Sequence, residues 1–187
     1  LREFIEKADI PCATTFLGLS AVPSNHPLNK GILGMHGNLG PNVMTNQCDL
    51  LIAVGMRFDD RVTGNLATYA KQAKIIHFDI DASEFNKNVK IDLGVLGNCK
   101  DTLKAVTALI DETKHSSWSN GFEPYKEKEY NKVISKALYP TEGPLLMGEV
   151  VNKVTEASGN EAILVTDVGQ NQLFACRYFK FTKPRSI

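Results

Sequence analysis

The chain has 187 residues, enough for one domain or for one domain with part of a second. Its apolar share of 43% and charged share of 22% are ordinary for a globular protein, and 21 basic residues balance 21 acidic ones. This balance argues against a generic nucleic-acid binder, which needs a one-sided basic surface. No stretch approaches the roughly 20 apolar residues of a membrane span.

The first part of the chain, residues 1–115, alternates helical patterns with short β-rich runs, which is typical of a parallel sheet with crossover helices. Its clearest strand is the apolar run Leu50–Val54, preceded by Asp49 and stopped by Gly55, and we expect both faces of this strand to be covered. The other elements expected here are a short helix before Pro11, a strand at 12–16, a helix at about 65–72, strands at 74–80 and within 89–96, and a helix at 99–110. The sequence therefore predicts an α/β fold with a parallel sheet flanked by helices.

A polar stretch from 114 to 141 separates this region from the rest of the chain. Its mixed-charge run, Glu123–Lys132, indicates a linker that contains a solvated helix. Beyond it, residues 145–154 are amphipathic, and Ala162–Thr166 has the pattern of a strand. One such βα unit is too small to bury a core, so we predict a truncated second domain. The predicted organisation is 1–115, a linker at 116–141, and 142–187.

The four cysteines, Cys12, Cys48, Cys99 and Cys176, are far apart and lack the CxxC spacing of zinc or redox sites. We predict that they are reduced and buried, which indicates a reducing, cytoplasmic compartment. The chain begins at Leu1 without a charged and then apolar leader, so no targeting signal is expected.

The first candidate binding loop, Gly34-Met35-His36-Gly37, places a histidine between two glycines. The missing glycine side chains would let a flat ligand approach the backbone. A turn with a surface histidine is the simpler alternative for this motif alone.

The second candidate loop runs from Gly55 to Gly64, directly after the clearest strand. Open α/β sheets bind ligands at the carboxyl ends of their strands, and Arg57 and Arg61 could clamp a diphosphate there. Asp59 could equally cap a helix that begins near Gly64, or pair with the same arginines. The chemistry of the loop leaves both interpretations open.

Two further segments follow predicted strands. Asp79 could accept hydrogen bonds from ribose hydroxyls, although an acidic helix start at Asp79–Glu84 is the alternative. In Thr166–Asn171, Gly169 opens a helix whose backbone amides could hold a phosphate. The chain has no G-x-G-x-x-G, no nucleophile paired with a base and no carboxylates at metal-ligand spacing, so no catalytic or metal-binding residue is assigned.

Together these segments resemble the catalytic subunit of acetohydroxyacid synthase (acetolactate synthase), a thiamine-diphosphate enzyme. The matching segments are Thr15–Gly18, Leu33–Gly37, Asp49–Leu51, Gly55–Gly64, Asp79–Asp81 with Glu84, and Thr166–Gln170. The resemblance covers residues 1–187 and is weakest at 114–141. It implies an internal fragment, with an FAD-binding middle domain at 1–115 that lacks its first strand and the start of a thiamine-diphosphate domain at 142–187.

The resemblance also implies a chemistry. The family joins two pyruvates, or pyruvate and 2-oxobutyrate, into a 2-acetohydroxyacid with loss of CO2, in branched-chain amino-acid biosynthesis. It uses thiamine diphosphate and Mg2+, and binds FAD without net redox work. The implied FAD ligands are Thr15, Phe16, Leu17, His36, Gly55, Arg57, Asp59, Arg61, Val62, Asp79, Ile80 and Glu84. The implied contacts to the diphosphate of thiamine diphosphate are Val168, Gly169 and Gln170. The expected partners are 2-oxoacid substrates and further copies of the chain, without nucleic acid or membrane; the presence of a regulatory subunit is left open.

Some positions depart from the family pattern. Asn171 stands where a histidine is common, and Asn98 replaces an aspartate near the adenine, so the roles of both are open. The family's catalytic glutamate and its Gly-Asp-Gly metal motif have no counterpart in the chain, so we predict that the chain alone is inactive. The rival interpretations are another thiamine-dependent decarboxylase, a pyruvate oxidase, or a nucleotide-binding module without catalysis.

Overall fold

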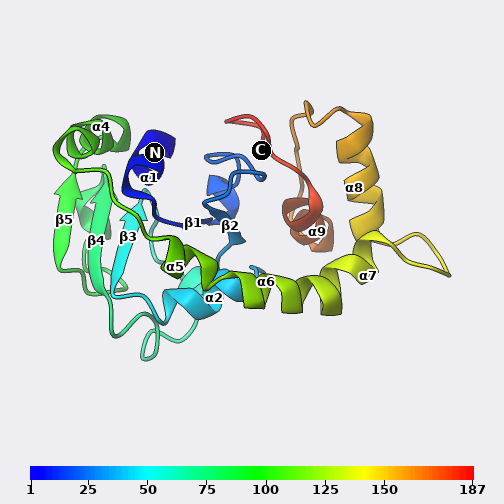
Figure 1. Cartoon of the computed structure of the whole chain (residues 1–187), viewed down its shortest axis with the longest axis horizontal. Coiled ribbons are helices and arrows are strands. Elements are labelled where there is room, and N and C mark those ends of the chain that lie inside the picture. Colours follow the sequence, from blue (N-terminus) through cyan, green and yellow to red (C-terminus); the bar gives the residue numbers. More distant parts are fainter.

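The computed structural model describes all 187 residues and has an α/β architecture built on parallel strands (Figure 1). The strands are β1 (Cys12–Thr14), β2 (Asn29–Ile32), β3 (Leu50–Val54), β4 (Lys74–Asp79) and β5 (Leu93–Leu96). The helices are α1 (Arg2–Ala8), α2 (Leu39–Thr45), α3 (Asp60–Thr63), α4 (Cys99–Leu109), α5 (Ser116–Asn120), α6 (Glu123–Glu129), α7 (Ser135–Leu138), α8 (Met147–Ala157) and α9 (Gln170–Tyr178). Short 3-10 helices η1 (Phe16–Gly18) and η2 (Ala82–Glu84) and a π-helical segment η3 (Tyr130–Ile134) complete the secondary structure.

The strands form two separate parallel sheets. One has the order β3-β4-β5 and the other pairs β1 with β2. In the larger sheet, β3 pairs with β4 from Leu50 opposite Lys74 to Val54 opposite Phe78. All these pairings are parallel, so the carboxyl ends of β3, β4 and β5 lie at the same edge of the sheet. The predicted α/β class is confirmed, but the single predicted sheet is divided in two.

Strand β3 is covered on both faces, as its apolar run predicts. Ile52 and Val54 pack against one hydrophobic cluster, whereas Leu51 and Ala53 belong to another. Successive side chains of a strand point to opposite faces, so the alternation places one cluster on each side of the sheet. Leu50, at the start of the strand, is exposed.

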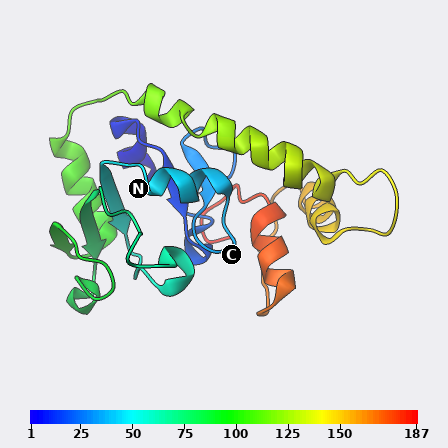
Figure 2. The same ribbon diagram turned by 90° about the horizontal axis from the view of Figure 1, so that it is seen from below.

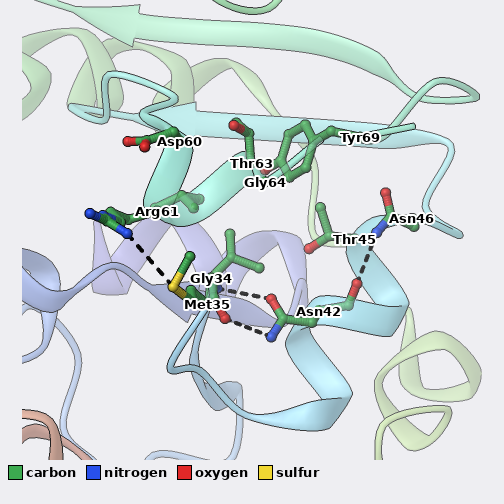
Figure 3. Close-up of a pocket in the computed structure, with 12 residues that line it drawn as sticks. Gly34, Met35, Asn42, Thr45, Asn46, Asp60, Arg61, Thr63, Gly64 and Tyr69 are labelled. Carbon is green, nitrogen blue, oxygen red and sulfur yellow. Dashed lines mark hydrogen bonds between the residues drawn. The ribbon is translucent and has the colours of Figure 1, made fainter. Parts of the chain in front are cut away.

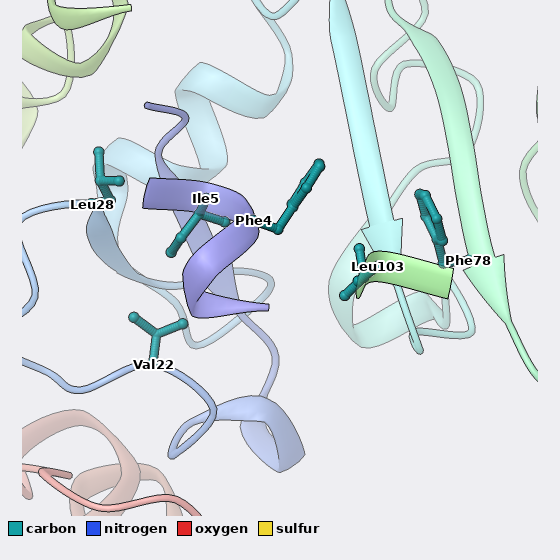
Figure 4. Packing of buried hydrophobic residues seen from close by; sticks show 6 residues of the cluster. All are labelled: Phe4, Ile5, Val22, Leu28, Phe78 and Leu103. Atoms are coloured by element: carbon teal, nitrogen blue, oxygen red, sulfur yellow. The ribbon is translucent and has the colours of Figure 1, made fainter. Parts of the chain in front are cut away.

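The first of these clusters fastens the N-terminal helix to the larger sheet (Figure 4). Phe4 and Ile5 of α1 belong to it, with Phe78 from β4 and Leu103 from α4. Most apolar positions of the two helices therefore face the core, whereas Leu109 of α4 is 85% exposed. Side chains of this size contribute about 2 kcal/mol each when they are fully buried.

The second half of the chain is mostly helical. Segments α5, α6, η3 and α7 run as one helical arm from the sheet towards α8 and α9 (Figure 2). Helix α9 and the residues after it pack against the smaller sheet, where Cys176, Phe179 and Phe181 share a cluster with Leu19 and Ile32. The backbone amide of Ser24 donates to the Phe181 carbonyl, and the Phe181 amide donates to the Ser24 Oγ. Residues 170–187 therefore share a core with residues of the first part of the chain.

Three sequence predictions about local structure are wrong. Residues 65–72 form turns, with Ala70 at φ 44°, because the backbone reverses before β4. The predicted strand Ala162–Thr166 is extended but has no neighbouring strand; Leu164 donates one backbone hydrogen bond to Ser186. The helix after Gly55 begins at Asp60 and ends at Thr63, directly before Gly64, near which it was expected to begin. No helix of the chain has both the length and the apolarity that a bilayer span requires.

Candidate functional site

The loops that follow β1 and β2 meet through two aromatic rings. Phe16 lies in η1, directly after β1, and its ring stacks on His36 with 6.5 Å between the centroids and 24° between the planes. Thr15 precedes Phe16 as the N-cap of η1, and Leu17 follows it with 94% of its surface exposed. The structure therefore brings Phe16 and His36 together and leaves the apolar side chain of Leu17 in solvent.

The Gly34–Gly37 loop is fixed to α2 and α3 (Figure 3). The Asn42 amide side chain accepts from the Gly34 amide at 2.9 Å and donates to the Gly34 carbonyl at 2.8 Å. The Met35 amide donates to the carbonyl of Arg61 at 2.7 Å. A Cβ on Gly34 would lie 2.6 Å from that same carbonyl oxygen, and the residue has φ +103°, so only glycine fits. The Gly34–Gly37 loop thus packs closely against α2 and α3, a role that the sequence motif did not predict.

The loop after β3 is anchored by one buried aromatic side chain. Phe58 is 2% exposed, has φ 51°, and its ring contacts the edges of Tyr69 and His77. Asp59, beside it, accepts hydrogen bonds from the amides of Arg61 and Val62 and so caps α3. The helix-capping role that the sequence left open for Asp59 is therefore present.

The two arginines of this loop point away from the protein interior. The guanidinium of Arg57 lies 3.4 Å from the Asp59 carboxylate, and both groups are exposed. The Arg61 side chain lies 3.8 Å from the sulfur of Met35. Both guanidinium groups remain accessible to an anion. The exposed Arg57–Asp59 pair itself contributes little to stability.

The segment after β4 bends back on itself through its acidic side chains. Asp79 accepts from the amide of Asp81, and Asp81 accepts from the amide of Ser83 and caps η2. The Ser83 hydrogen bonds hold the pKa of Asp81 below its usual value. Glu84 pairs with Lys87 at 2.7 Å, and Ile80 is exposed. Asp81 therefore makes the acidic helix start, while the largely buried Asp79 turns its second carboxylate oxygen towards His77.

Beside Asp79 lies an unusual core histidine. His77 is completely buried between the edges of Phe58 and Phe85, and neither ring nitrogen has a hydrogen-bond partner. Its Nε2 lies 3.5 Å from the Asp79 carboxylate. Sequence reasoning missed this residue, because the position in β4 reads as an interruption of an apolar run.

In the second half, the predicted diphosphate residues lie at the start of α9. Gly169 is the N-cap with φ 142° and offers no side-chain cap, while Gln170 begins the helix. Val168 is 85% exposed, and its amide donates to the carboxylate of Asp167. The free amides of a helix N-terminus favour an anion.

Two cavities flank α3, and only some of the predicted FAD ligands line them. The larger, about 330 Å³, lies between the Gly34 loop, α2 and α3, and contains Arg61 and Val62 (Figure 3). Tyr69 lines it as well; burial raises the pKa of this phenol, and its hydroxyl has no partner. The smaller, about 250 Å³, includes Asp59. The remaining predicted residues lie outside both cavities.

The cysteines are all free thiols. Cys48 and Cys176 are buried, as predicted, while Cys12 and Cys99 are only partly buried. Burial raises the pKa of all four thiols, that of Cys12 to about 11, so they are poor nucleophiles at neutral pH. No group of three or more His, Cys, Asp or Glu side chains is arranged to hold a metal ion.

Parallel strands, flanking helices and touching carboxyl-end loops define an α/β domain of the kind that binds ligands at this edge of the sheet. Residues 1–106 match the family described as the thiamine pyrophosphate enzyme central domain, and the chain belongs to this family.

Relatives extend the similarity to the rest of the chain. The chain is 38% identical, over its whole length, to a probable acetolactate synthase large subunit of Methanocaldococcus jannaschii. It is 36% identical, over 99% of its length, to acetolactate synthase 1 of Oryza sativa subsp. japonica, and 37% identical to the acetolactate synthase large subunit of Buchnera aphidicola. The chain spans 32%, 29% and 32% of these three relatives. Its similarity to acetolactate synthase large subunits therefore includes the residues after 106.

Proposed function

We propose that the protein supplies the flavin-binding loops and the first diphosphate contacts of an acetolactate synthase. In this reaction two pyruvates, or pyruvate and 2-oxobutyrate, combine into a 2-acetohydroxyacid and CO2 leaves, as a step of branched-chain amino-acid biosynthesis. The similarity to synthase subunits along the chain supports the proposal. The name of the matched family supports thiamine diphosphate as a cofactor of the enzyme.

One structural observation carries the flavin assignment: the loops after successive strands form an unbroken chain of contacts. Phe16 after β1 stacks on His36 after β2, and Met35 donates to Arg61 after β3. The Asn88 side chain, in the segment after β4, donates to the carbonyl of Arg57 in the loop after β3, at 3.3 Å. An elongated dinucleotide such as FAD is suited to such a row of loops.

The side chains of this row fit the parts of FAD. The exposed guanidinium groups of Arg57 and Arg61 suit its diphosphate, and the carboxylate of Asp79 suits ribose hydroxyls. The stacked rings of Phe16 and His36 offer a flat apolar surface to the flavin. Thr15, Leu17, Gly55, Asp59, Val62, Ile80 and Glu84 complete the proposed contacts.

Thiamine diphosphate would meet the chain at the start of α9. The uncapped amides after Gly169 suit one of its phosphates, together with Val168 and Gln170. When bound, this cofactor supplies the means by which a 2-oxoacid loses CO2. The residues of this chain bind and orient; none is placed to transfer a proton. Mg2+ does not fit, because no cluster of suitable ligands exists here, and we assign no step to it.

Several finer expectations belong to the same proposal. The family resemblance supports assembly with further copies of the catalytic chain and with a regulatory subunit. The four free thiols support a reducing, cytoplasmic location. Because no acid for cofactor activation is assigned in the chain, we infer that it forms no acetolactate by itself.

The test is a titration of the 187-residue chain with FAD, followed by flavin fluorescence. We expect saturable quenching, and we expect Arg57→Met to weaken it. Lys153→Met, an exposed lysine of α8 remote from the loops, is the control and should bind FAD normally. Absence of saturable quenching would contradict the flavin assignment.

A second measurement addresses the reaction. We expect no acetolactate when the chain is incubated with pyruvate, FAD, thiamine diphosphate and Mg2+. Acetolactate in this assay would disprove the inference that the chain alone is inactive. Oxygen consumption with pyruvate would instead favour an oxidase, and FAD binding without any turnover is compatible with a synthase segment or with a binding module.

A further inference from the structure

The segment Leu33–Asn38 lies between β2 and α2 and belongs to neither a strand nor a helix, and Leu39 is the first residue of α2. Its backbone groups therefore need partners from elsewhere in the chain. At the start of the loop, Asn42 and Arg61 hold Gly34 and Met35, as described above. The rest of the loop is held by two charged side chains from much later in the sequence.

The first of these side chains is Arg177, near the end of α9. Its Nη1 donates to the carbonyl oxygens of His36, at 3.4 Å, and Gly37, at 3.3 Å. The second is Glu129, the last residue of α6. Its Oε2 accepts from the amide of Leu39, at 3.1 Å, and from the Asn38 side chain, at 3.2 Å. Arg177 and Glu129 also form an ion pair with each other.

A single ion pair thus satisfies two carbonyls on one side of the loop and two donors on the other. The side chains of Arg177 and Glu129 are 20% and 10% exposed. In such shielded surroundings charge-assisted hydrogen bonds are strong, and removing one partner leaves the other charge uncompensated. The pair is therefore unlike an ordinary surface salt bridge.

The chain contains a natural comparison for this pair. Lys183 and Glu161 also form an ion pair in the second half, but their side chains are 58% and 59% exposed. Neither side chain has a hydrogen-bond partner in the loops after β1 to β4. The Lys183–Glu161 pair therefore has the same charges as Arg177–Glu129 but no hydrogen bond to these loops.

Arg177 and Glu129 lie in a different part of the chain from the loop that they hold. Both residues follow residue 106, where the match to the central-domain family ends. Glu129 stands directly before the π-helical segment η3, and such segments change the direction of the side chains along a helix. Arg177 lies on the helix that begins at Gly169 and Gln170, and its neighbour Cys176 packs against Ile32 of β2.

We propose that Arg177, paired with Glu129, is a positioning residue for the His36 loop. The flavin-side loop of the central domain is held by the helix that starts at the diphosphate loop, and the two cofactor loops are connected through this ion pair. This inference rests on the proposed function, because it takes His36 as a flavin contact. Arg177 is assigned no contact with either cofactor in this proposal.

The test compares Arg177→Met with Lys183→Met in the full chain. FAD affinity is measured by fluorescence quenching, and the mobility of residues 33–44 by hydrogen–deuterium exchange. We expect Arg177→Met to weaken FAD binding about tenfold, the effect of losing one charge-assisted interaction, and to speed exchange of the Leu39 amide. Lys183→Met should change neither. Arg177→Lys keeps the charge but loses the forked geometry, and should recover part of the affinity.

FAD affinity and exchange that are unchanged in Arg177→Met would overturn the proposal. So would equal weakening by Lys183→Met, because the effect would then come from charge alone. If Arg177→Met does not fold, Arg177→Lys carries the same comparison, with a several-fold weakening expected. If the unsubstituted chain binds no FAD, the proposed function fails at the flavin site; exchange then decides the positioning role by itself, faster exchange supporting it and unchanged exchange refuting it.

Discussion

Residues 50–63 and 162–178 share a coarse pattern and differ in structure. Each segment begins with an apolar run, Leu50–Val54 or Ala162–Thr166, and continues through a glycine into a helix. The first run forms β3, paired with β4 along its length, and its loop is anchored by the buried Phe58. The second run is extended but unpaired, and the corresponding residue before its helix, Val168, is 85% exposed.

The difference teaches that an apolar run becomes a strand only where a neighbouring strand accepts its backbone hydrogen bonds. Lys74–Asp79 provides that neighbour for β3. Within this chain, Leu164 has only the Ser186 carbonyl as a backbone acceptor. The anchored loop after β3 and the exposed loop at Val168 therefore differ because of backbone pairing, and not because of local apolarity.

The largest expected difference between the two loops lies in their anchors. Phe58→Ala removes a buried aromatic side chain and should lower the free energy of unfolding by about 3 kcal/mol, because the surrounding core cannot fill the space. Val168→Ala should change it by less than about 0.5 kcal/mol. Urea denaturation of both variants measures the contrast. Similar effects of the two substitutions would show that the loop after β3 is not anchored by Phe58.

A smaller effect is expected at Gly34, where geometry excludes a side chain. Gly34→Ala should lower the free energy of unfolding by about 2 kcal/mol, from positive φ and a clash with a backbone carbonyl. Gly143 has a comparable φ of +96°, but a Cβ there would meet no atom within 4 Å. Gly143→Ala therefore reports backbone strain alone and should cost about 1 kcal/mol. Equal losses in thermal unfolding would remove the clash from the explanation.

The smallest effect is expected at the cap of α3. Asp59→Ala removes the side chain that accepts from two helix amides and should lower the free energy of unfolding by about 1 kcal/mol. Asp60→Ala changes the charge equally but removes no cap, and serves as the control. Chemical denaturation of both variants decides whether capping matters; a larger loss for Asp60→Ala would assign the effect to charge.

The sequence predicts the parts of the fold that depend on local pattern. The run Leu50–Val54, the strand that starts at Lys74 and the amphipathic helix Cys99–Leu109 all lie where expected. Strand β2 and helix α2 escape prediction because their few apolar residues are interrupted by Gly31, Gly40 and Pro41. Their places are set by contacts with other elements.

Some features of the candidate site likewise follow from local sequence pattern, and others depend on distant contacts. Glycine and charged residues after predicted strands mark the loops in advance, and the motif match extends this to named positions. The side chains that hold the loops have no local signature. Glu129 and Arg177 act on backbone groups 90 and 140 positions away, and Asn42 acts across the turn between β2 and α2. Long-range partners of this kind are visible only in three dimensions.

The hydrogen bonds between Ser24 and Phe181 have a consequence for how the protein reaches its native state. They join residues separated by 157 positions, and the cluster of Leu19 and Ile32 is completed by Phe179 and Phe181. Contacts between such distant residues slow folding, and on the ribosome they must wait for the later partner. The smaller sheet therefore completes its core only after residue 181 has left the exit tunnel, while the β3–β4–β5 sheet can form before it.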